Sequence, residues 1–233
     1  MKKYLFIAAA ALLSASCFHV NVNFKDFGGT FKNAIKGEGP VETRELGYQD
    51  FHTIRVNGHA DITFVQAEQW KVSLTTQENI FEALDYEVID SVLVIQNEGG
   101  RSVKAEEYDL YIQAPWLKQL EVNGAADFKA DSPLKSDRNL LVEVNGAAEI
   151  EFPKGITCGE LVFSSHGASD IEAHGLDVGK LTVQIDGAGD VTVSGKAGEA
   201  QLNVNGAGDI DAKELQVAGE LKKKASGAAR IRL

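Results

Sequence analysis

The sequence of 233 residues is poor in the residues that cross-link or kink a chain, with two cysteines, four prolines and one methionine. Positive charge is also scarce: 23 Lys and Arg face 34 Asp and Glu, a formal net charge of −11. Because an acidic protein without a basic cluster before its last turn repels the phosphate backbone, nucleic-acid binding is excluded. A hydrophobic content of 44% and a charged content of 24% are typical of a globular protein, not of a disordered chain or a membrane bundle.

The apolar run near the N-terminus is too short to cross a membrane. It covers residues 4–13 after a basic start, whereas a helix that spans a hydrocarbon core of about 30 Å needs about 20 residues. Residues 13–17 (LSASC) resemble the bacterial lipobox, in which small residues precede a cysteine that is lipidated after cleavage. We therefore expect residues 1–16 to be a lipoprotein signal peptide, Cys17 to carry the lipid that holds the protein on the membrane, and residues 17–40 to be a tether. The alternative is a lone cysteine beside an ordinary cleavage site.

Cys158 is then the remaining cysteine of the mature chain, so no disulfide is expected within it. We expect it to pack as a small apolar side chain. The alternative is a reactive thiol, but no histidine or other base lies at a recognisable spacing from it. The expected location is the outer membrane of an exported lipoprotein, with the periplasmic and the outer side both left open.

Glycine, by contrast, is abundant: the chain has 23 glycines, and seven of them belong to a repeated sequence motif. Seven segments share the pattern of VNGAADF at 122–128, and their glycines are Gly58, Gly124, Gly146, Gly167, Gly187, Gly206 and Gly227. From Gly124 onward these glycines lie 22, 21, 20, 19 and 21 residues apart with no helical pattern between them, and the first gap of 66 residues equals about three periods. Such a period predicts an all-β fold, a parallel β-solenoid of about 20 residues per turn, because single turns must stack to bury their apolar side chains.

Alignment of the repeats on their glycine gives columns of like residues. Four positions after the glycine the residues are apolar and predict a core stack: Phe128, Ile150, Ile171, Val191 and Ile210. The glycine is expected at positive φ or where a neighbouring backbone leaves no room for a Cβ. The residue before it is Asn, Asp, His or Ser, whose stacked side chains can hydrogen-bond the next turn. The alanine after it predicts a position too tight for a larger side chain.

The rest of the chain is expected to extend and close this stack. Residues 41–116 contain strand-like runs and a short helical turn over 77–85, and predict a β-rich N-terminal half of the solenoid with longer excursions. Residues 117–219 form the regular turns. Three consecutive lysines mark 220–233 as a capping turn, because lysine at an exposed sheet edge opposes the addition of further strands.

An ordered set of short patterns precedes and includes the glycine motifs within residues 47–233: Phe51-x-x-Ile54-x-Val56, Asp61-Ile62-Thr63, Leu93-x-Ile95 and Tyr111-Ile112-x-Ala114-Pro115-x-Leu117. This set resembles the family of exported or lipid-anchored Bacteroidota proteins called putative auto-transporter adhesin, head GIN domain. The resemblance implies a single-stranded right-handed parallel β-helix, and it implies no established activity and no catalytic residues. The last motif departs from the pattern, with Arg230 where the others carry an acid.

Three positions after the glycine, an acidic residue recurs. One hypothesis is a cation-binding ladder, because Ca²⁺ takes several carboxylate oxygens; its members would be Asp127, Glu149, Asp170, Asp190 and Asp209. The favoured alternative is that each carboxylate accepts backbone N–H bonds in its own turn. Two exposed charges about 5 Å apart repel by about 0.8 kcal/mol in water, which turn hydrogen bonds can offset. No metal site or cofactor is therefore assigned, and Arg230 is expected to neutralise the end of the ladder.

Polysaccharide cleavage is the main enzymatic alternative, because β-helices often carry that activity. Hydrolysis needs two acids in different environments, whereas the motif acids recur identically in each turn. After Trp116 the aromatic residues are Phe128, Phe152 and Phe163, all assigned to the core, so they offer no platform for a sugar. The histidines show no metal-ligand spacing. We therefore expect no catalytic residues.

The remaining interpretation is a non-enzymatic, lipid-anchored protein of the cell envelope with an adhesion-like or scaffolding role through the solenoid faces. Besides the membrane, the expected partner is an envelope protein or glycan. The candidate binding patch consists of aromatic residues of the N-terminal half: Trp70, Tyr86, Tyr108, Tyr111 and Trp116. A polysaccharide-acting enzyme is the second hypothesis and a calcium-dependent binding module the third. The oligomeric state is not predicted.

Overall fold

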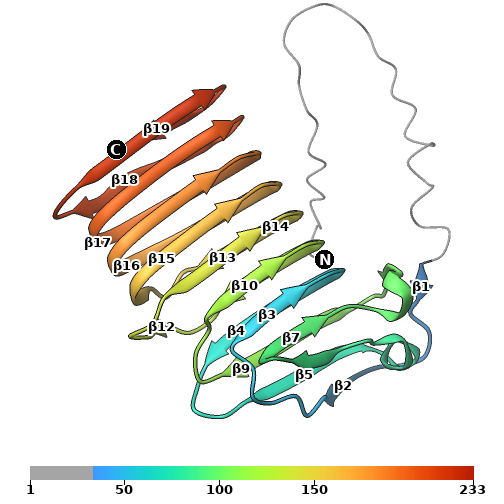
Figure 1. Cartoon of the computed structure of the whole chain (residues 1–233). Coiled ribbons are helices and arrows are strands. Elements are labelled where there is room, and N and C mark those ends of the chain that lie inside the picture. Colours follow the sequence, from blue (N-terminus) through green and yellow to red (C-terminus); the bar gives the residue numbers. More distant parts are fainter. Residues whose placement is uncertain (1–33) are drawn as a thin grey trace, which may run out of the picture. The chain divides into compact units, whose positions relative to one another are not determined.

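The chain folds into a β-solenoid, and the computed structural model describes it over residues 34–233 (Figure 1). About 5 turns of about 21 residues each stack on one another through parallel strands. The all-β solenoid predicted from the glycine period is therefore confirmed. The expected signal peptide, Cys17 and the tether up to residue 33 lie outside the described residues.

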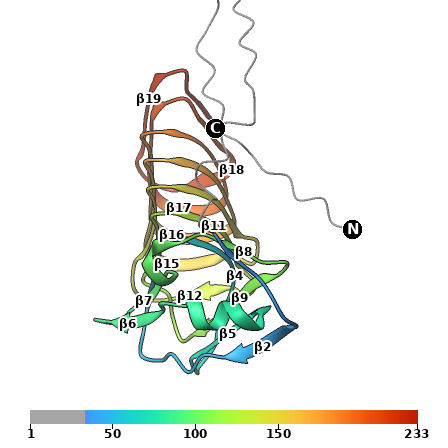
Figure 2. The same cartoon turned by 90° about the vertical axis from the view of Figure 1, so that its right-hand side faces the viewer.

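Each turn has three sides, and Figure 2 shows the stacked turns from a second direction. Side 1 holds the strands that precede the motif glycine: β3 (Thr53–Val56), β10 (Gln119–Val122), β13 (Leu140–Val144), the end of β15 (Ile156–Ser165) and β19 (Leu221–Gly227). Side 2 holds those that follow it: β4 (His59–Gln66), β11 (Ala125–Ala130), β14 (Ala147–Phe152), the start of β18 (Asp209–Val217) and β20 (Arg230–Arg232).

Side 3 begins with β12 (Leu134–Lys135), which pairs with the start of β15. In the middle turns β16 (Ala168–Ile185) and β17 (Ala188–Gly206) run through all three sides.

Equivalent apolar side chains stack in columns inside the solenoid. The column after the motif glycine pairs strand by strand: Ile150 with Ile171, Ile171 with Val191 and Val191 with Ile210. Aromatic rings form a second stack, with neighbouring centroids 5.7–6.0 Å apart: Phe64, Phe128, Phe152 and Phe163. All these side chains are almost completely buried. The core columns predicted from the aligned repeats are confirmed.

The motif glycines lie at the corner between sides 1 and 2, where successive turns are in close contact. A Cβ on Gly146 would lie 1.9 Å from the carbonyl oxygen of Gly124. That oxygen accepts a hydrogen bond of 2.9 Å from the backbone N–H of Ala147, which holds the turns at this distance. Of the seven motif glycines, Gly206 and Gly227 have a positive φ. Close backbone approach is therefore the common reason for glycine at this corner.

The polar residues before the motif glycine form a ladder along the same corner. Asn123 Nδ2 donates to Asn57 Oδ1 at 3.1 Å, and Asn145 Nδ2 donates to Asn123 Oδ1 at 3.0 Å. In the last turn Ser226 Oγ donates to Asn205 Oδ1 at 2.9 Å. The predicted side-chain bonds between turns are therefore present.

The structure corrects the expectation for the alanine after the glycine. This position faces outward: Ala147 and Ala188 are exposed, and His59 holds the position in the first turn. The inward position with little room is the next one, where Ala60 and Ala126 are buried. The alanine column is therefore not explained by tight packing.

A second corner, between sides 3 and 1, is also lined by glycines that the motif alignment does not include. They are Gly159, Gly179, Gly198 and Gly219. A Cβ on Gly179 would lie 2.7 Å from Gly159 O, and one on Gly198 would lie 2.5 Å from Gly179 O. Close backbone approach is thus the reason for glycine at this corner as well.

The segment between the first two motif glycines forms a base at the N-terminal end of the stack. β3 lies between β7 (Val92–Ile95) and β10, while β4 lies between β9 (Tyr108–Ala114) and β11 (Figure 1). Gly58 and Gly124 are therefore neighbours in the stack. The 65 residues between them do not correspond to three periods; they form the base, which includes β7 and β9, and the chain returns to the stack at β10.

Antiparallel pairs close this base. β2 (Val41–Glu45) pairs with β5 (Lys71–Gln77), β5 pairs with β9, and β6 (Glu87–Ile89) pairs with β7. A short 3₁₀ helix, η2 (Glu78–Ala83), lies within the helical turn expected over 77–85, and η3 (Glu98–Gly100) follows β7. β1 (Ile35–Lys36) pairs with β8 (Val103–Lys104).

Candidate functional site

Side 2 carries a column of carboxylates that stand in register on successive turns. The pairs are Asp61 with Asp127, Asp127 with Glu149, Glu149 with Asp170 and Asp170 with Asp190. Asp209 continues the column, because its N–H donates to Asp190 Oδ1 at 2.9 Å. Neighbouring strands lie about 4.8 Å apart, so the structure brings together the five acids predicted from the repeat. β9 adds Asp109 beside Asp61, which the repeat alignment misses because no motif glycine precedes it.

Burial and mutual repulsion disfavour ionisation within this carboxylate column. The pKa values of Asp61, Glu149 and Asp170 are all raised above their ordinary values. Partial loss of contact with water is the largest cause in each case, and neighbouring carboxylates raise the pKa further. At Asp61 the imidazole of His59, whose Nε2 lies 3.3 Å from Oδ1, opposes the shift of the pKa.

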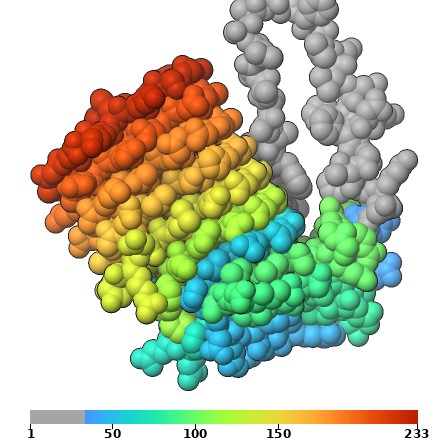
Figure 3. Space-filling model, viewed as in Figure 1, coloured from blue at the N-terminus to red at the C-terminus, as the bar shows by residue number. Residues whose placement is uncertain are grey.

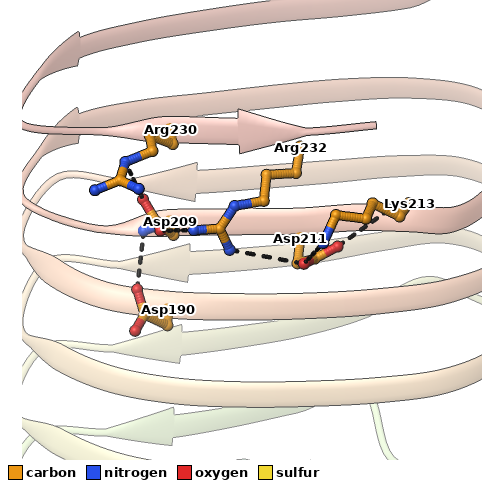
Figure 4. A network of polar contacts seen from close by, with 6 residues as sticks. All are labelled: Asp190, Asp209, Asp211, Lys213, Arg230 and Arg232. Atoms are coloured by element: carbon orange, nitrogen blue, oxygen red, sulfur yellow. Dashed lines mark hydrogen bonds and ion pairs between the residues drawn. The ribbon is translucent and has the colours of Figure 1, made fainter.

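At the C-terminal end of the carboxylate column, arginines replace the acids (Figure 4). Arg230 stands in register with Asp209, and Arg232 with Asp211. Arg232 Nη2 donates to Asp209 Oδ2 at 2.6 Å, and its Nη1 lies 3.7 Å from Asp211 Oδ2. Arg230 Nε lies 4.0 Å from Asp209 Oδ1, and 75% of its side chain is exposed. The neutralisation that the repeat assigns to Arg230 is therefore performed mainly by Arg232.

Removal of Arg232 should weaken the last turn. We expect Arg232→Leu to lower the free energy of unfolding by about 1 kcal/mol, and by less at high salt, because this partly exposed ion pair is screened. Urea unfolding at two salt concentrations measures the loss. Arg230→Leu removes the same charge without the short contact and should cost less than half as much; equal losses would show that net charge, not the contact with Asp209, stabilises this end.

The carboxylates of the column on side 2 do not converge on one point. Within residues 34–233, no group of three or more His, Cys, Asp or Glu side chains is arranged to hold a metal ion. The hydrogen bond from Asp209 to Asp190 joins two turns, which differs from the bond within one turn expected from the repeat. Beside the column, Lys129 Nζ bonds Glu151 Oε2 at 2.5 Å. The carboxylates of successive turns therefore share no common centre that could hold a metal ion.

The raised pKa values give the sign of the pH dependence. A carboxyl group whose folded pKa exceeds its unfolded value binds more protons in the folded state, so its contribution to stability falls as pH rises through that interval. Glu149→Gln should therefore raise the free energy of unfolding at pH 7 by a few tenths of a kcal/mol, a small gain because exposed charges are screened. The gain should shrink as pH falls toward the ordinary Glu value of 4.5.

Urea unfolding of the two proteins at pH 7 and at about pH 4 measures this difference. Glu68→Gln, in the exposed loop between β4 and β5, removes the same charge outside the column and is the matched control. A loss of stability at pH 7 in Glu149→Gln would contradict the role of repulsion in the column.

The aromatic residues proposed as a binding patch do not form one exposed surface. Tyr86 and Tyr108 are 7% and 8% exposed, and their hydroxyls hydrogen-bond each other at 2.6 Å inside the base. Burial raises the pKa of Tyr108 to about 12. Trp70, Tyr111 and Trp116 are partly exposed, in the loop before β5, on β9 and directly after β9. Three of the five side chains therefore remain available to solvent.

Trp116 is part of a small cluster of aromatic and cationic side chains. The ring centroid of Trp116 lies 4.6 Å from that of His52, and the Arg138 guanidinium lies 4.3 Å from the centroid of the Trp116 ring. Burial, Lys118 and Arg138 lower the pKa of His52 below its ordinary value. The ring of Trp116, a member of the candidate binding patch, is thus already in contact with two side chains of the same chain.

An open hollow of about 370 Å³ lies near this cluster, between the loops that follow β4 and β11. Its lining residues are Gln66, Ala67, Glu68, Pro115, Pro133 and Lys135. The side-chain amide of Gln66, at the end of β4, donates to the carbonyl oxygens of Pro115, just after β9, and of Lys135, in β12, at 2.9 and 2.7 Å. The hollow is therefore a gap between segments that are held together by hydrogen bonds, with Glu68 and Lys135 as its charged lining residues.

Cys158 lies on side 3 with its side chain in the core, as expected. It is 7% exposed, and burial raises the pKa of its thiol to about 11. A thiol with this pKa is protonated at neutral pH and a poor nucleophile.

These features define a class of protein: a β-solenoid with a filled core, glycine-lined corners and like side chains repeated along its outer sides. The chain belongs to the family called putative auto-transporter adhesin, head GIN domain, which matches residues 50–233. The resemblance carried by the ordered sequence patterns is therefore confirmed. In the part of the chain that the structure describes, no helix is both long and apolar enough to cross a membrane.

Solved structures share this fold. A putative adhesin from Parabacteroides distasonis is 21% identical with a TM-score of 0.71, and the similarity covers 85% of this chain and 100% of that one. A putative lipid binding protein from the same species is 20% identical, with a TM-score of 0.70 and coverage of 85% and 99%. A putative adhesin from Bacteroides fragilis is 19% identical, with a TM-score of 0.68 and coverage of 85% and 100%. At these identities the similarity establishes the fold alone. No curated protein matches the sequence.

Proposed function

We propose that this protein is a non-enzymatic, lipid-anchored component of the cell envelope that binds an envelope protein or glycan along side 2 of its solenoid. Membership of an adhesin-like family supports the coarser part of this proposal, an exported or envelope protein. The observation that carries the proposal is the repetition of one carboxylate per turn in register along side 2. A surface that repeats at a fixed interval suits a partner that is itself extended.

The net charge of the solenoid supports a cationic or polar partner surface, and the carboxylate column places part of that charge on side 2. Residues 34–219 contain 14 Lys and Arg and 32 Asp and Glu, a net charge of −18. In the space-filling view, which faces the strands of side 1, the turns run across the molecule as parallel ridges (Figure 3), and side 2 carries its carboxylates at the same interval of one turn. Such a surface attracts a basic partner over several turns and repels other anionic surfaces.

The lipid anchor is tested at Cys17. We expect the full chain to sediment with membranes and to incorporate a labelled fatty acid, and the Cys17→Ala variant to lose both properties. Protease treatment of intact cells then separates exposure on the outer side from a periplasmic position. Membrane association and labelling that persist in Cys17→Ala would overturn the anchor.

Binding through side 2 is tested by charge reversal on its outer surface. Glu151→Lys with Glu172→Lys changes two outward residues of adjacent turns, and Glu121→Lys with Glu143→Lys makes the same change of charge on side 1 as a control. We expect the first pair alone to weaken binding to isolated cell envelopes by about tenfold. Equal losses, or release of reducing ends from a polysaccharide panel, would contradict the proposal.

A further inference from the structure

The last turn of the solenoid differs from the rest in charge and in pairing. Residues 34–219 carry a net charge of −18, whereas residues 220–233 contain five Lys and Arg and one Glu, a net charge of +4. All seven residues of β19 are exposed. In the described part of the chain β19 pairs with β17 alone. Its outer edge therefore presents a row of backbone N–H and C=O groups that no further turn uses.

Lysines stand on both faces of this edge strand. Lys222 and Lys224 are in register with outward residues of side 1, and Lys223 is in register with Leu202 of the core column. Lys222 Nζ lies 2.9 Å from a carboxylate oxygen of Glu220. Across residues 34–233, no ion pair engages Lys223 or Lys224. An open strand edge and uncompensated positive charge thus coincide at one end of an acidic molecule.

We propose that the outer edge of β19 binds an acidic, extended peptide segment of a partner protein, which adds a strand to side 1. Strand addition supplies backbone hydrogen bonds for any extended peptide, and the side chains at the edge decide which peptide is accepted. The lysines pair with acidic side chains, while the charge of −18 on the body repels the same peptide elsewhere. The positive end thereby directs an acidic strand to β19.

The same lysines explain why other strands are refused. A second copy of this chain would present its own +4 end turn, so pairing of two such ends brings like charges together. An apolar strand would bury the ammonium groups without a partner, which is unfavourable. The proposal adds selectivity to the cap expected from the sequence. It concerns the end of the solenoid and not side 2, so it stands or falls independently of the proposed function.

Three synthetic peptides of seven residues test the proposal on the purified full chain. The first, Thr-Glu-Val-Glu-Val-Glu-Thr, is acidic and favours an extended conformation. The second has the same sequence with alternate backbone nitrogens methylated, and the third carries Lys in place of Glu. We expect the first peptide to bind at least about tenfold more tightly than either of the others. Equal binding of the methylated peptide would overturn strand addition, and equal binding of the basic peptide would overturn charge selection.

Two double variants locate the site. Lys222→Glu with Lys224→Glu should weaken the acidic peptide by about tenfold and strengthen the basic one, because attraction becomes repulsion at the edge. Lys154→Glu with Lys196→Glu makes the same change of net charge on exposed residues away from β19 and should have little effect. Lys224→Glu alone is the substitute if the first double variant unfolds. An equal loss of binding in the control variant would overturn the site.

Hydrogen exchange locates the bound peptide directly. When the acidic peptide is bound, alternate amides of 221–227 should exchange more slowly; protection confined to another segment would overturn the site.

Discussion

Gly146→Ala should destabilise the protein by about 3–5 kcal/mol, among the largest effects that one methyl group can have. Its Cβ would lie 1.9 Å from Gly124 O and 2.9 Å from Gly124 C, and both atoms belong to the backbone. A flexible side chain could move aside, but this oxygen is held by the hydrogen bond from Ala147. The substitution must therefore separate two turns and break the parallel pairing beside the corner.

Gly58→Ala is the matched control for this prediction. Gly58 occupies the same column, but it lies at the end of the glycine stack, and the nearest atom to a Cβ there is Asn97 Nδ2 at 3.9 Å. We expect Gly58→Ala to change the free energy of unfolding by about 0.5 kcal/mol or less. Urea unfolding of both variants measures the contrast; a similar loss in the two would show that backbone flexibility, not close approach, is the reason for glycine at this corner.

This steric constraint also explains why the regular turns can be predicted from the sequence. Where the backbones of two successive turns lie so close that a Cβ would clash, glycine is required. The sequence distance between such glycines therefore equals the number of residues in one turn. The second glycine column contains the same information: Gly159, Gly179, Gly198 and Gly219 lie 20, 19 and 21 residues apart. Alignment on that column would also have predicted the corner between sides 3 and 1.

The base could not be predicted in this way, because its strands are not related by the repeat. The gap between Gly58 and Gly124 fits three periods in length, yet the two glycines are adjacent in space. Antiparallel pairing in the base depends on contacts between segments that share no motif, such as β2 with β5. For the same reason the composition of the N-terminal half could not show that Tyr86 and Tyr108 lie inside it.

The carboxylate column was predictable in its position but not in its interactions. Its register follows from the repeat, since each acid stands at a fixed offset from a glycine. Which arginine neutralises its end depends on side-chain direction: Arg232 reaches back to Asp209, although Arg230 is the residue in register with it. The arginine that forms the short ion pair lies two residues after the one in register with Asp209. An alignment of the repeats shows the register but not how far a side chain reaches.

Phe152→Ala should lower the free energy of unfolding by about 4 kcal/mol, near the upper end for core truncations. The ring is 1% exposed and lies between those of Phe128 and Phe163, with centroids 5.7 and 6.0 Å away. On the next turn the residue in register is Ala173, which is too small to fill the vacated space. Because backbone hydrogen bonds fix the spacing of the turns, the walls of the cavity cannot close.

The measurement is urea unfolding together with native-state hydrogen exchange, and Phe152→Leu is the control. Leucine keeps most of the apolar volume and should cost about 1 kcal/mol. Since each turn contacts its neighbours alone, exchange in Phe152→Ala should accelerate most in β11, β14 and β15 and less in β18. A loss as small as that of Phe152→Leu would show that the turns can move together to fill the cavity, and uniform acceleration would show that the solenoid unfolds as one cooperative unit.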